Sequence, residues 1–251
     1  MSCVNVRGCR IGEGRPKVIL PIVERTEAAI LEKAVQFSTL SADCVEWRAD
    51  WFEGFQSPAA IARCIQKLRV ALRDKLLLVT LRTKAEGGEQ ALSHSEYLAF
   101  LRLILDTDCA DLLDIEFFTA GADLSKLVEQ AHSAGVAVVC SSHDFAKTPP
   151  RAELVCRMVQ MQQAGADLPK LAVMPRCRTD VLELLTATAE MADHHPETPV
   201  ITMSMGALGA VSRLAGETFG SAMTFANPGQ ASAPGQVSLN IVNEVLDALH
   251  L

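Results

Sequence analysis

The sequence lacks the features that mark several classes of protein. Its formal net charge is -7 and it has no cluster of Lys and Arg, so we expect no nucleic-acid partner. No apolar run approaches the ~18 residues of a membrane span, so no membrane partner is expected either. Residues 1–17 have no apolar segment before their charges, unlike a secretory signal.

The cysteines show no pattern of disulfides or of metal ligands. No two of them form a Cys-x-x-Cys pair, and several lie in apolar segments, as small buried side chains do. We therefore expect free thiols in a reducing cytoplasm. The positions are Cys3, Cys9, Cys44, Cys64, Cys109, Cys140, Cys156 and Cys177.

No linker or low-complexity tract interrupts the chain, so residues 1–251 are expected to form a single domain with a substantial core. Short apolar segments, typical of buried strands, alternate with longer segments of helical periodicity. The expected strands are 17–23, 44–50, 76–82, 111–117, 135–144, 168–175, 199–206 and 221–227. The expected helices are 25–38, 57–72, 93–106, 122–134, 149–164, 178–193, 207–217 and 236–249.

Local signals support some of these helices. Ser57-Pro58 is a start signal for one helix, and Ser93 with Glu96 forms a capping box at the start of the next. In the first helix, four apolar side chains are predicted to lie roughly on one face. They are Ala28, Leu31, Val35 and Phe37.

Eight strands that alternate with eight helices predict a parallel sheet, because each crossover helix returns the chain in the same direction. Closed on itself, this α/β sheet is a (β/α)8 TIM barrel, and an open doubly wound sheet is the alternative. No Gly-rich phosphate loop follows the first strand, which argues against a dinucleotide-binding sheet. Residues 1–14 are predicted to form a β-hairpin that closes the bottom of the barrel.

Polar residues gather at the expected strand ends, where a barrel of this kind carries its chemistry. Along the second strand, Glu46, Arg48 and Asp50 have the same parity and therefore lie on one face. Each later strand end, or the loop after it, adds polar residues. In chain order they are Thr80, Arg82 and Glu86 (third strand), Asp114 and Glu116 (fourth), Ser141 and His143 (fifth), Lys170 (sixth), Arg213 (seventh), and Ser232 and Gln236 (eighth).

Lys170 stands inside an otherwise apolar strand. It shares parity with Ala172 and Met174, which directs its side chain towards the barrel axis. Burial there, with the arginines of other strand ends nearby, would disfavour the ammonium form and leave a neutral amine able to condense with a ketone. The alternative is a buried structural lysine paired with Glu46, Asp114 or Glu116.

His143 ends the strand next to that of Lys170, so both side chains can reach one substrate atom. Histidine transfers protons near neutral pH, and Glu86 is a candidate to orient its ring. A histidine that only caps the following helix or sits hydrogen-bonded in the core is the structural alternative. The coincidence with Lys170 favours the catalytic interpretation.

The arginines Arg48, Arg82 and Arg213 indicate an anionic, hydroxylated small molecule, because guanidinium groups bind carboxylates in a planar, bidentate way. Acidic residues interleave with these arginines, which argues against a metal site. Residues 226–240 combine Gly, Pro and small residues. They form either a surface loop or, as we prefer, a lid that closes over the mouth of the barrel.

Several motifs, in order, resemble those of the type I 3-dehydroquinate dehydratase family, the Schiff-base lyases of the shikimate pathway. They are EWRAD (46–50), TLRTKAEGG (80–88), DIE (114–116), SSHD (141–144), PKLAVMP (169–175), MSMGALGAVSR (203–213) and SAPGQ (232–236). The resemblance spans nearly the whole chain from the first strand.

The resemblance implies a lyase that removes water from 3-dehydroquinate to give 3-dehydroshikimate, commonly as a homodimer and with no metal or organic cofactor. Lys170 is similar to the family's imine-forming lysine, His143 to its general acid/base, and Glu86 to the carboxylate that supports this histidine. The positions that resemble substrate contacts are Arg213 for the carboxylate, Glu46, Arg48 and Arg82 for hydroxyls, Met203, Met205 and Phe225 for apolar walls, and Ser232 and Gln236 for the lid.

Two other functions stay open. A class I aldolase acting on a small keto-sugar acid shares the barrel and the lysine imine but breaks a C–C bond. Such an enzyme usually has a Gly-rich phosphate site near the last strands, and GALGAVSR (206–213) could mimic part of one. A barrel that binds its ligand without catalysis is the other alternative.

Overall fold

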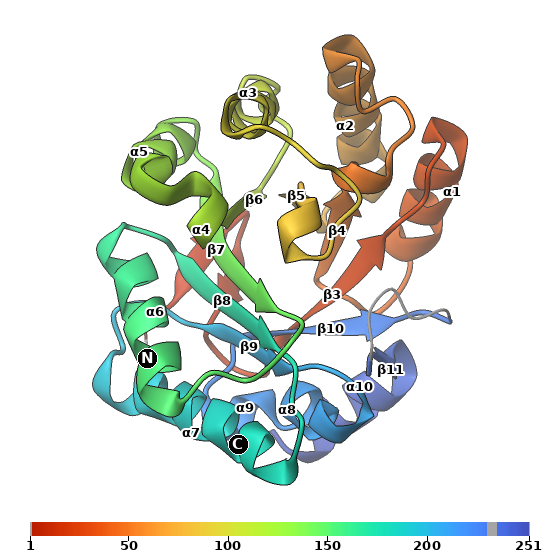
Figure 1. Ribbon diagram of the computed structural model, residues 1–251. Coiled ribbons are helices and arrows are strands. Elements are labelled where there is room, and N and C mark those ends of the chain that lie inside the picture. Colours follow the sequence, from red (N-terminus) through yellow and green to blue (C-terminus); the bar gives the residue numbers. More distant parts are fainter. Residues whose placement is uncertain (1, 230–234, 251) are drawn as a thin grey trace.

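The computed structural model describes residues 2–229 and 235–250, which form a closed ring of parallel strands surrounded by helices (Figure 1). The ring consists of β3 (Lys17–Ile22), β4 (Cys44–Arg48), β5 (Leu76–Thr80), β6 (Leu112–Glu116), β7 (Ala137–Asp144), β8 (Leu168–Val173), β9 (Ile201–Ser204) and β10 (Met223–Asn227). From β3 to β9 each strand pairs in parallel with the next along the chain, and β10 pairs with β3.

The two ends of this sheet meet between β9 and β10. A parallel bridge joins Val200 to Ser221, and the Ala222 amide donates to the Val200 carbonyl at 2.8 Å. The short β11 (Val237–Ser238) pairs with the end of β10. The predicted eight-stranded barrel is therefore confirmed, and the open doubly wound alternative is wrong.

Helices cover the outer face of the ring (Figure 1). The α-helices are α1 (Glu27–Ser38), α2 (Pro58–Leu72), α3 (His94–Leu105), α4 (Phe117–Ala120), α5 (Leu124–Ser133), α6 (Arg151–Gln163), α7 (Arg178–His194), α8 (Val211–Leu214), α9 (Gly216–Phe219) and α10 (Leu239–Ala248). Short 3-10 turns are η1 (Ala49–Trp51), η2 (Lys84–Glu86), η3 (Gly121–Asp123) and η4 (Ala207–Gly209).

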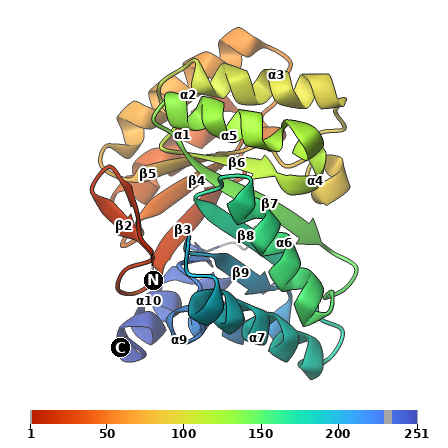
Figure 2. The same cartoon turned by 90° about the vertical axis from the view of Figure 1, so that its left-hand side faces the viewer.

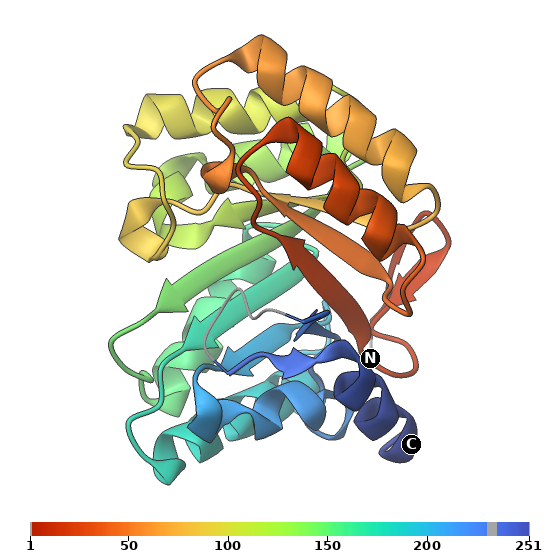
Figure 3. The same ribbon diagram turned by 90° about the vertical axis from the view of Figure 1, so that its right-hand side faces the viewer.

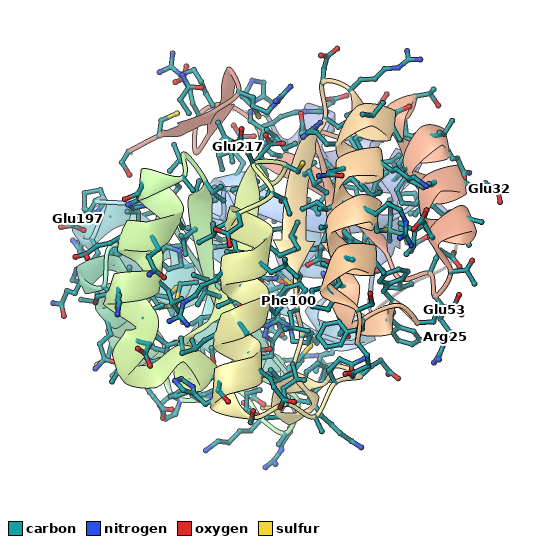
Figure 4. All side chains as sticks on the ribbon, turned by 90° about the horizontal axis from the view of Figure 1, so that it is seen from above. Arg25, Glu32, Glu53, Phe100, Glu197 and Glu217 are labelled. Atoms are coloured by element: carbon teal, nitrogen blue, oxygen red, sulfur yellow. The ribbon has the colours of Figure 1, made fainter. Side chains whose placement is uncertain are left out.

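The predicted helix starts at Ser57 and Ser93 are confirmed. The Ser57 side chain accepts from the Ala60 amide, and Ser93 and Glu96 form both bonds of the capping box. Neighbouring helices also contact one another. In Figure 4, Phe100 of α3 lies between α2 and α3, and its ring stacks on Phe55 at a centroid distance of 5.6 Å.

The predicted face of α1 is confirmed for Leu31 and Phe37, which pack against the core, and wrong for Ala28 and Val35. Val35 is 59% exposed, whereas the helix buries Ile30, Ala34 and Phe37 against the sheet. At 3.6 residues per turn these three positions share a face, and Ala28 lies outside it, exposed to solvent. The apolar stripe of this helix is broad, so its centre could not be located from residue type alone.

The expected helix 207–217 is also wrong as a single element, because the structure divides it into η4, α8 and α9. Gly206 has φ +70°, in the left-handed region, and breaks the chain direction after β9. A Cβ at Gly209 would lie 2.2 Å from the Ser204 carbonyl oxygen, so the turn packs directly on the strand backbone. A continuous helix would not bring these two backbones together.

Two apolar layers hold the barrel together. Outward-facing side chains such as Val45, Trp47 and Val79 pack under the helices, and inward-facing ones such as Ile19 and Leu78 fill the ring. The inner layer is completed by the antiparallel hairpin β1 (Val4–Val6) and β2 (Cys9–Ile11).

The hairpin lies at the end of the barrel opposite the strand arrowheads (Figures 2 and 3). Val6 and Ile11 are buried there against the inner apolar layer. The prediction that the first residues close the bottom of the barrel is thus confirmed.

In the part of the chain that the structure describes, no helix is both long and apolar enough to cross a bilayer.

Replacing Ile11 by Ala should lower the free energy of unfolding by about 2–5 kcal/mol, because the deleted atoms leave a cavity between the hairpin and the barrel. Urea unfolding followed by circular dichroism measures this loss. Val70→Ala on α2, where the side chain is 79% exposed, should change stability by no more than about 0.5 kcal/mol. Equal effects of the two substitutions would contradict a sealed barrel floor.

Candidate active site

The inward face of the strands changes from apolar to polar towards their carboxyl ends. Leu78 is followed two residues later by Thr80, Leu112 by Asp114, and Leu168 by Lys170. Because side chains alternate along a strand, these polar groups point into the ring above the inner apolar layer. The strand register brings Ser141 beside Lys170 and Thr80 beside Asp114. The polar layer therefore follows from the alternation of inward-facing and outward-facing side chains along each strand.

A pocket of about 550 Å³, measured out to where it opens to solvent, lies over this polar layer. Its lining residues are Glu46, Arg48, Arg82, Glu86, Gly87, His143, Phe145, Lys170, Ala172, Met203, Met205, Arg213, Phe225 and Gln236. All the site residues predicted from the sequence are brought together here except Ser232, which lies outside the described residues.

Lys170 is 3% exposed and points inward, as its parity predicts. Its Nζ donates to Asp114 Oδ2 at 3.1 Å and lies 4.9 Å from the centroid of the Phe225 ring. The structure therefore combines the two interpretations of this residue, because the lysine lines the pocket and is paired with a carboxylate. The surroundings of Lys170 therefore include Asp114 and Phe225 as well as the arginines expected from the sequence.

His143 and Glu86 form a buried pair. Glu86 Oε2 lies 2.8 Å from His143 Nδ1 and accepts from the His143 backbone amide at 3.0 Å. Burial lowers the pKa of His143 well below its usual value, and the positive charges of Arg82, Lys170 and Arg48 act in the same direction. Burial raises the pKa of Glu86 to about 8 despite the nearby Arg82. Since Nδ1 is engaged with Glu86, Nε2 is the ring nitrogen that remains for proton exchange in the pocket.

Arg82 is held by the acidic residues of β6. Its guanidinium donates to Asp114 and Glu116, each at 2.9 Å, and to Ser141 at 3.0 Å. Burial alone would lower the pKa of Arg82, but the two carboxylates raise it. Arg82 is thus fixed in position and charge at the wall of the pocket.

Arg48 and Glu46 are positioned from β4 in a similar way. Asp50 accepts two hydrogen bonds from Arg48, at 2.7 and 2.8 Å, in the bidentate geometry that gives strong pairs. Glu46 accepts from the Thr80 hydroxyl at 2.8 Å. Asp50 itself does not line the pocket, so its carboxylate acts on Arg48.

Arg213 reaches the pocket from α8, the short helix after β9. Its side chain is buried, its Nη1 lies 3.6 Å from Met203 Sδ, and burial lowers its pKa to about 10. Ser212 donates to the Gly209 carbonyl and accepts from the Ser204 amide, which fixes the turn that carries the arginine. The segment 206–213 therefore serves to place Arg213.

The mouth of the pocket is bordered by segments that the sequence analysis did not assign to the site. The Phe145 ring stacks on His143 with an interplanar angle of 16° and a centroid distance of 6.4 Å. A Cβ at Gly87 would lie 2.4 Å from the Phe145 ring, and Gly87 has φ +82°, so any other residue there would be strained and would have to displace the ring. The Gly-Gly step after Glu86 was a signal of close packing, but it did not identify the aromatic partner.

The predicted lid, residues 226–240, is described only in part. Gly235 packs on the backbone of Gly206, since a Cβ there would lie 2.2 Å from the Gly206 oxygen. The Asn227 side chain donates to the Gln236 carbonyl at 3.1 Å. These contacts bring Gln236 to the pocket, and residues 230–234 lie outside the described part.

Within residues 2–229 and 235–250, no group of three His, Cys, Asp or Glu side chains is arranged to hold a metal ion. All eight cysteines are free thiols; Cys44, Cys64 and Cys140 are buried, and Cys156 and Cys177 are exposed.

The fold and this set of side chains define a class of protein, the parallel barrels whose carboxyl-end pocket combines a buried lysine, a histidine–glutamate pair and arginines. Comparison with known families identifies one family within that class. The family model of type I 3-dehydroquinase matches residues 18–251. The chain belongs to the type I 3-dehydroquinase family.

Similar proteins cover essentially the whole chain. A 3-dehydroquinate dehydratase of Bacillus subtilis (strain 168) is 46% identical over 250 residues, which are 100% of this chain and 98% of that protein. The solved type I 3-dehydroquinate dehydratase of Clostridium difficile, with covalently modified comenic acid, has a TM-score of 0.96 and 42% identity and covers 99% of this chain and 98% of its own. The enzyme structure from Enterococcus faecalis has a TM-score of 0.93 and 41% identity, over 99% and 100% of the two chains.

Replacing Glu86 by Gln should change how stability depends on pH. Burial raises the pKa of Glu86 from 4.5 to about 8, so the original chain loses stability as pH rises through this interval, because the unfolded state releases the proton first. In Glu86→Gln this contribution is absent, and urea unfolding at a series of pH values should show a smaller decline. Glu32→Gln, on the outer face of α1 (Figure 4), should keep the original slope. An unchanged slope in Glu86→Gln would contradict the shift.

Proposed function

We propose that this chain dehydrates 3-dehydroquinate to 3-dehydroshikimate, a step of the shikimate pathway, through an imine on Lys170. The observation that carries the proposal is a buried lysine in the same pocket as a His143–Glu86 pair. The family and the names of its full-length relatives supply the substrate. The covalent adduct named for the Clostridium difficile relative is consistent with a pocket that bonds to its ligand.

The first chemical step joins the Lys170 nitrogen to the ketone carbon of the substrate. The nitrogen must give up a proton to attack, and the carbonyl oxygen leaves as water. Over the whole step, ammonium and ketone become a protonated imine and water. The protonated imine withdraws electrons from the adjacent carbon, so the C–H bond there becomes acidic enough for a neutral imidazole to remove the proton.

His143 then acts twice. As the neutral base, it takes the proton from the carbon next to the imine, and the electron pair moves to nitrogen to give an enamine. As the resulting acid, it gives a proton to the β-hydroxyl, which leaves as water while the imine forms again. Addition of water to that imine releases the product and the lysine. Its lowered pKa keeps the imidazole of His143 neutral before the reaction.

The other lining residues bind the substrate in this proposal. Arg213 pairs with the carboxylate, because a buried guanidinium gains most from an anionic partner. Glu46, Arg48 and Arg82 bind the hydroxyl groups. Met203, Met205 and Phe225 form the apolar walls, and Gln236 contributes from the end of the predicted lid. The family resemblance gives Ser232 a similar role, and this residue lies outside the described part of the chain.

The class I aldolase alternative is less well supported. Its expected phosphate site would use the segment 206–213, but the Ser212 hydroxyl there bonds to the Gly209 carbonyl and the Ser204 amide in building the turn that carries Arg213. The relatives described above are named as dehydratases. A barrel that only binds its ligand is distinguished by the trapping experiment below.

We also propose that the protein is a homodimer, as the family resemblance implies, and that it is cytoplasmic, since its unpaired cysteines suit a reducing compartment. Light scattering that gives twice the 27.0 kDa mass of the chain would support the dimer, and a monomer mass at micromolar concentration would exclude it.

Incubation with 3-dehydroquinate and borohydride should add one substrate-derived group, with the mass of the bound ketone plus two hydrogens less one water, located on Lys170 by peptide mass spectrometry. The imine must form before borohydride can reduce it. Lys170→Met should give no adduct, whereas Lys67→Met on α2, a surface lysine, should give the adduct of the original chain. Recovery of unmodified protein, despite measured binding of substrate, would exclude the imine and favour a binding function.

His143→Ala should keep imine formation but lower kcat about 10²- to 10⁴-fold, the usual contribution of a general acid/base. The rate follows from the absorbance of the enone carboxylate product, and the imine from the borohydride adduct. His132→Ala on α5, where the ring is exposed and paired with Asp167, should keep the original rate. Full activity of His143→Ala would remove this histidine from the mechanism.

A further inference from the structure

Asp114 is a fully buried carboxylate that contacts the reacting nitrogen but does not line the pocket. Its Oδ2 accepts from Lys170 Nζ at 3.1 Å and from Arg82 Nη2 at 2.9 Å. Its Oδ1 accepts from the Ser141 hydroxyl at 2.6 Å. The side chains of Arg82 and Ser141 thus fix the orientation of Asp114 relative to Lys170.

This carboxylate is held in its ionised form. Burial would raise the pKa of Asp114, but Arg82 and Lys170 lower it. The bond from Ser141 also favours the charged form. A permanent negative charge therefore lies within hydrogen-bonding distance of the nitrogen that would form the imine.

The other charged or titratable groups around Lys170 are engaged elsewhere. They are Glu46 and Arg48 from β4, Arg82 after β5, Glu86 from η2, Glu116 from β6, His143 from β7 and Arg213 from α8. Glu116 accepts from Arg82 and Thr83, Glu46 from Thr80, and Glu86 from His143. Among the described residues, the carboxylate within ion-pair distance of Lys170 Nζ is that of Asp114.

The charge balance of imine formation gives this contact a role. An ammonium and a ketone become a protonated imine and water, so the same nitrogen carries one positive charge before and after the step. A neutral imine would be a weak electron sink. Burial and the surrounding arginines both favour the neutral form, so the protonated imine requires a negative charge at its nitrogen.

We propose that Asp114 is the counter-ion of Lys170, first of its ammonium and then of the protonated imine, and that it acts as a positioning residue for the dehydration. This inference rests on the proposed function. The inference gives the two acidic residues of β6 different roles. Asp114 accepts hydrogen bonds from both Lys170 and Arg82. Glu116 accepts from Arg82, Thr83 and Thr119 and has no bond to Lys170 among those of the described residues.

The test is the pH profile of kcat in Asp114→Asn. This substitution keeps the shape of the side chain and removes its charge, so the imine should lose its proton at a lower pH. The basic limb of the profile should move down by about 1 to 3 pH units, with the loss of activity largest at high pH. The borohydride adduct on Lys170 should still form on the acidic side of the limb.

Glu116→Gln is the matched control, because it removes one negative charge from the same strand without touching Lys170. It should lower kcat without moving the basic limb. If Asp114→Asn instead loses activity equally at every pH, or if Glu116→Gln moves the limb as far, Asp114 is not the counter-ion.

Asp114→Ser decides the matter should Asp114→Asn fail to fold, as judged by circular dichroism. It removes the same charge with a smaller side chain, so the basic limb should again move to lower pH. An unmoved limb would then overturn the proposal. Absence of any borohydride adduct in the original chain would overturn the proposed imine chemistry, an outcome distinct from failure of the counter-ion alone.

Discussion

Positive charge inside the barrel must be matched by buried carboxylates, and the arrangement of the site depends on this constraint. Arg82 and Lys170 share Asp114, and Glu116 completes the set around Arg82. Removing one partner of such a pair leaves an uncompensated charge at a cost of about 3–5 kcal/mol, far above the value of a surface ion pair. Because Arg82 follows β5 while Asp114 and Lys170 lie on β6 and β8, these ion pairs also tie the polar layer of the barrel together across several strands.

The pocket has two sides of different character. On the side of β4 to β8, each basic group contacts a carboxylate supplied by the protein. On the side of β9 and β10, Arg213 lies among Met203, Met205 and Phe225, and burial lowers its pKa. An acid that enters the pocket with its carboxylate towards Arg213 and its ketone towards Lys170 would meet both sides in the orientation that the chemistry requires.

The strands could be predicted from their short apolar runs, and the barrel from the alternation of strands with helices. The inward direction of Lys170 followed from the period-two alternation of side chains along a strand. The convergence of the lining residues followed from the rule that strand ends meet at one face of a barrel. The fragmentation of 207–217 could not be predicted, since it depends on the contact between Gly209 and the Ser204 backbone. Phe145 was missed for a similar reason, because an aromatic ring in a loop has no periodicity that indicates where it packs.

The junction between β9 and β10 has a mechanical consequence. The backbone ladder runs without interruption from β10 through β3 to β9, and in the described residues a single bridge, Val200 to Ser221, connects its two ends. The turn that carries Arg213 bonds to both strands that border this junction, because the Thr224 hydroxyl of β10 donates to the Arg213 carbonyl at 2.8 Å and the Ser204 amide of β9 donates to the Ser212 hydroxyl at 2.9 Å. The segment that places Arg213 in the pocket therefore also fastens the two ends of the ladder to each other.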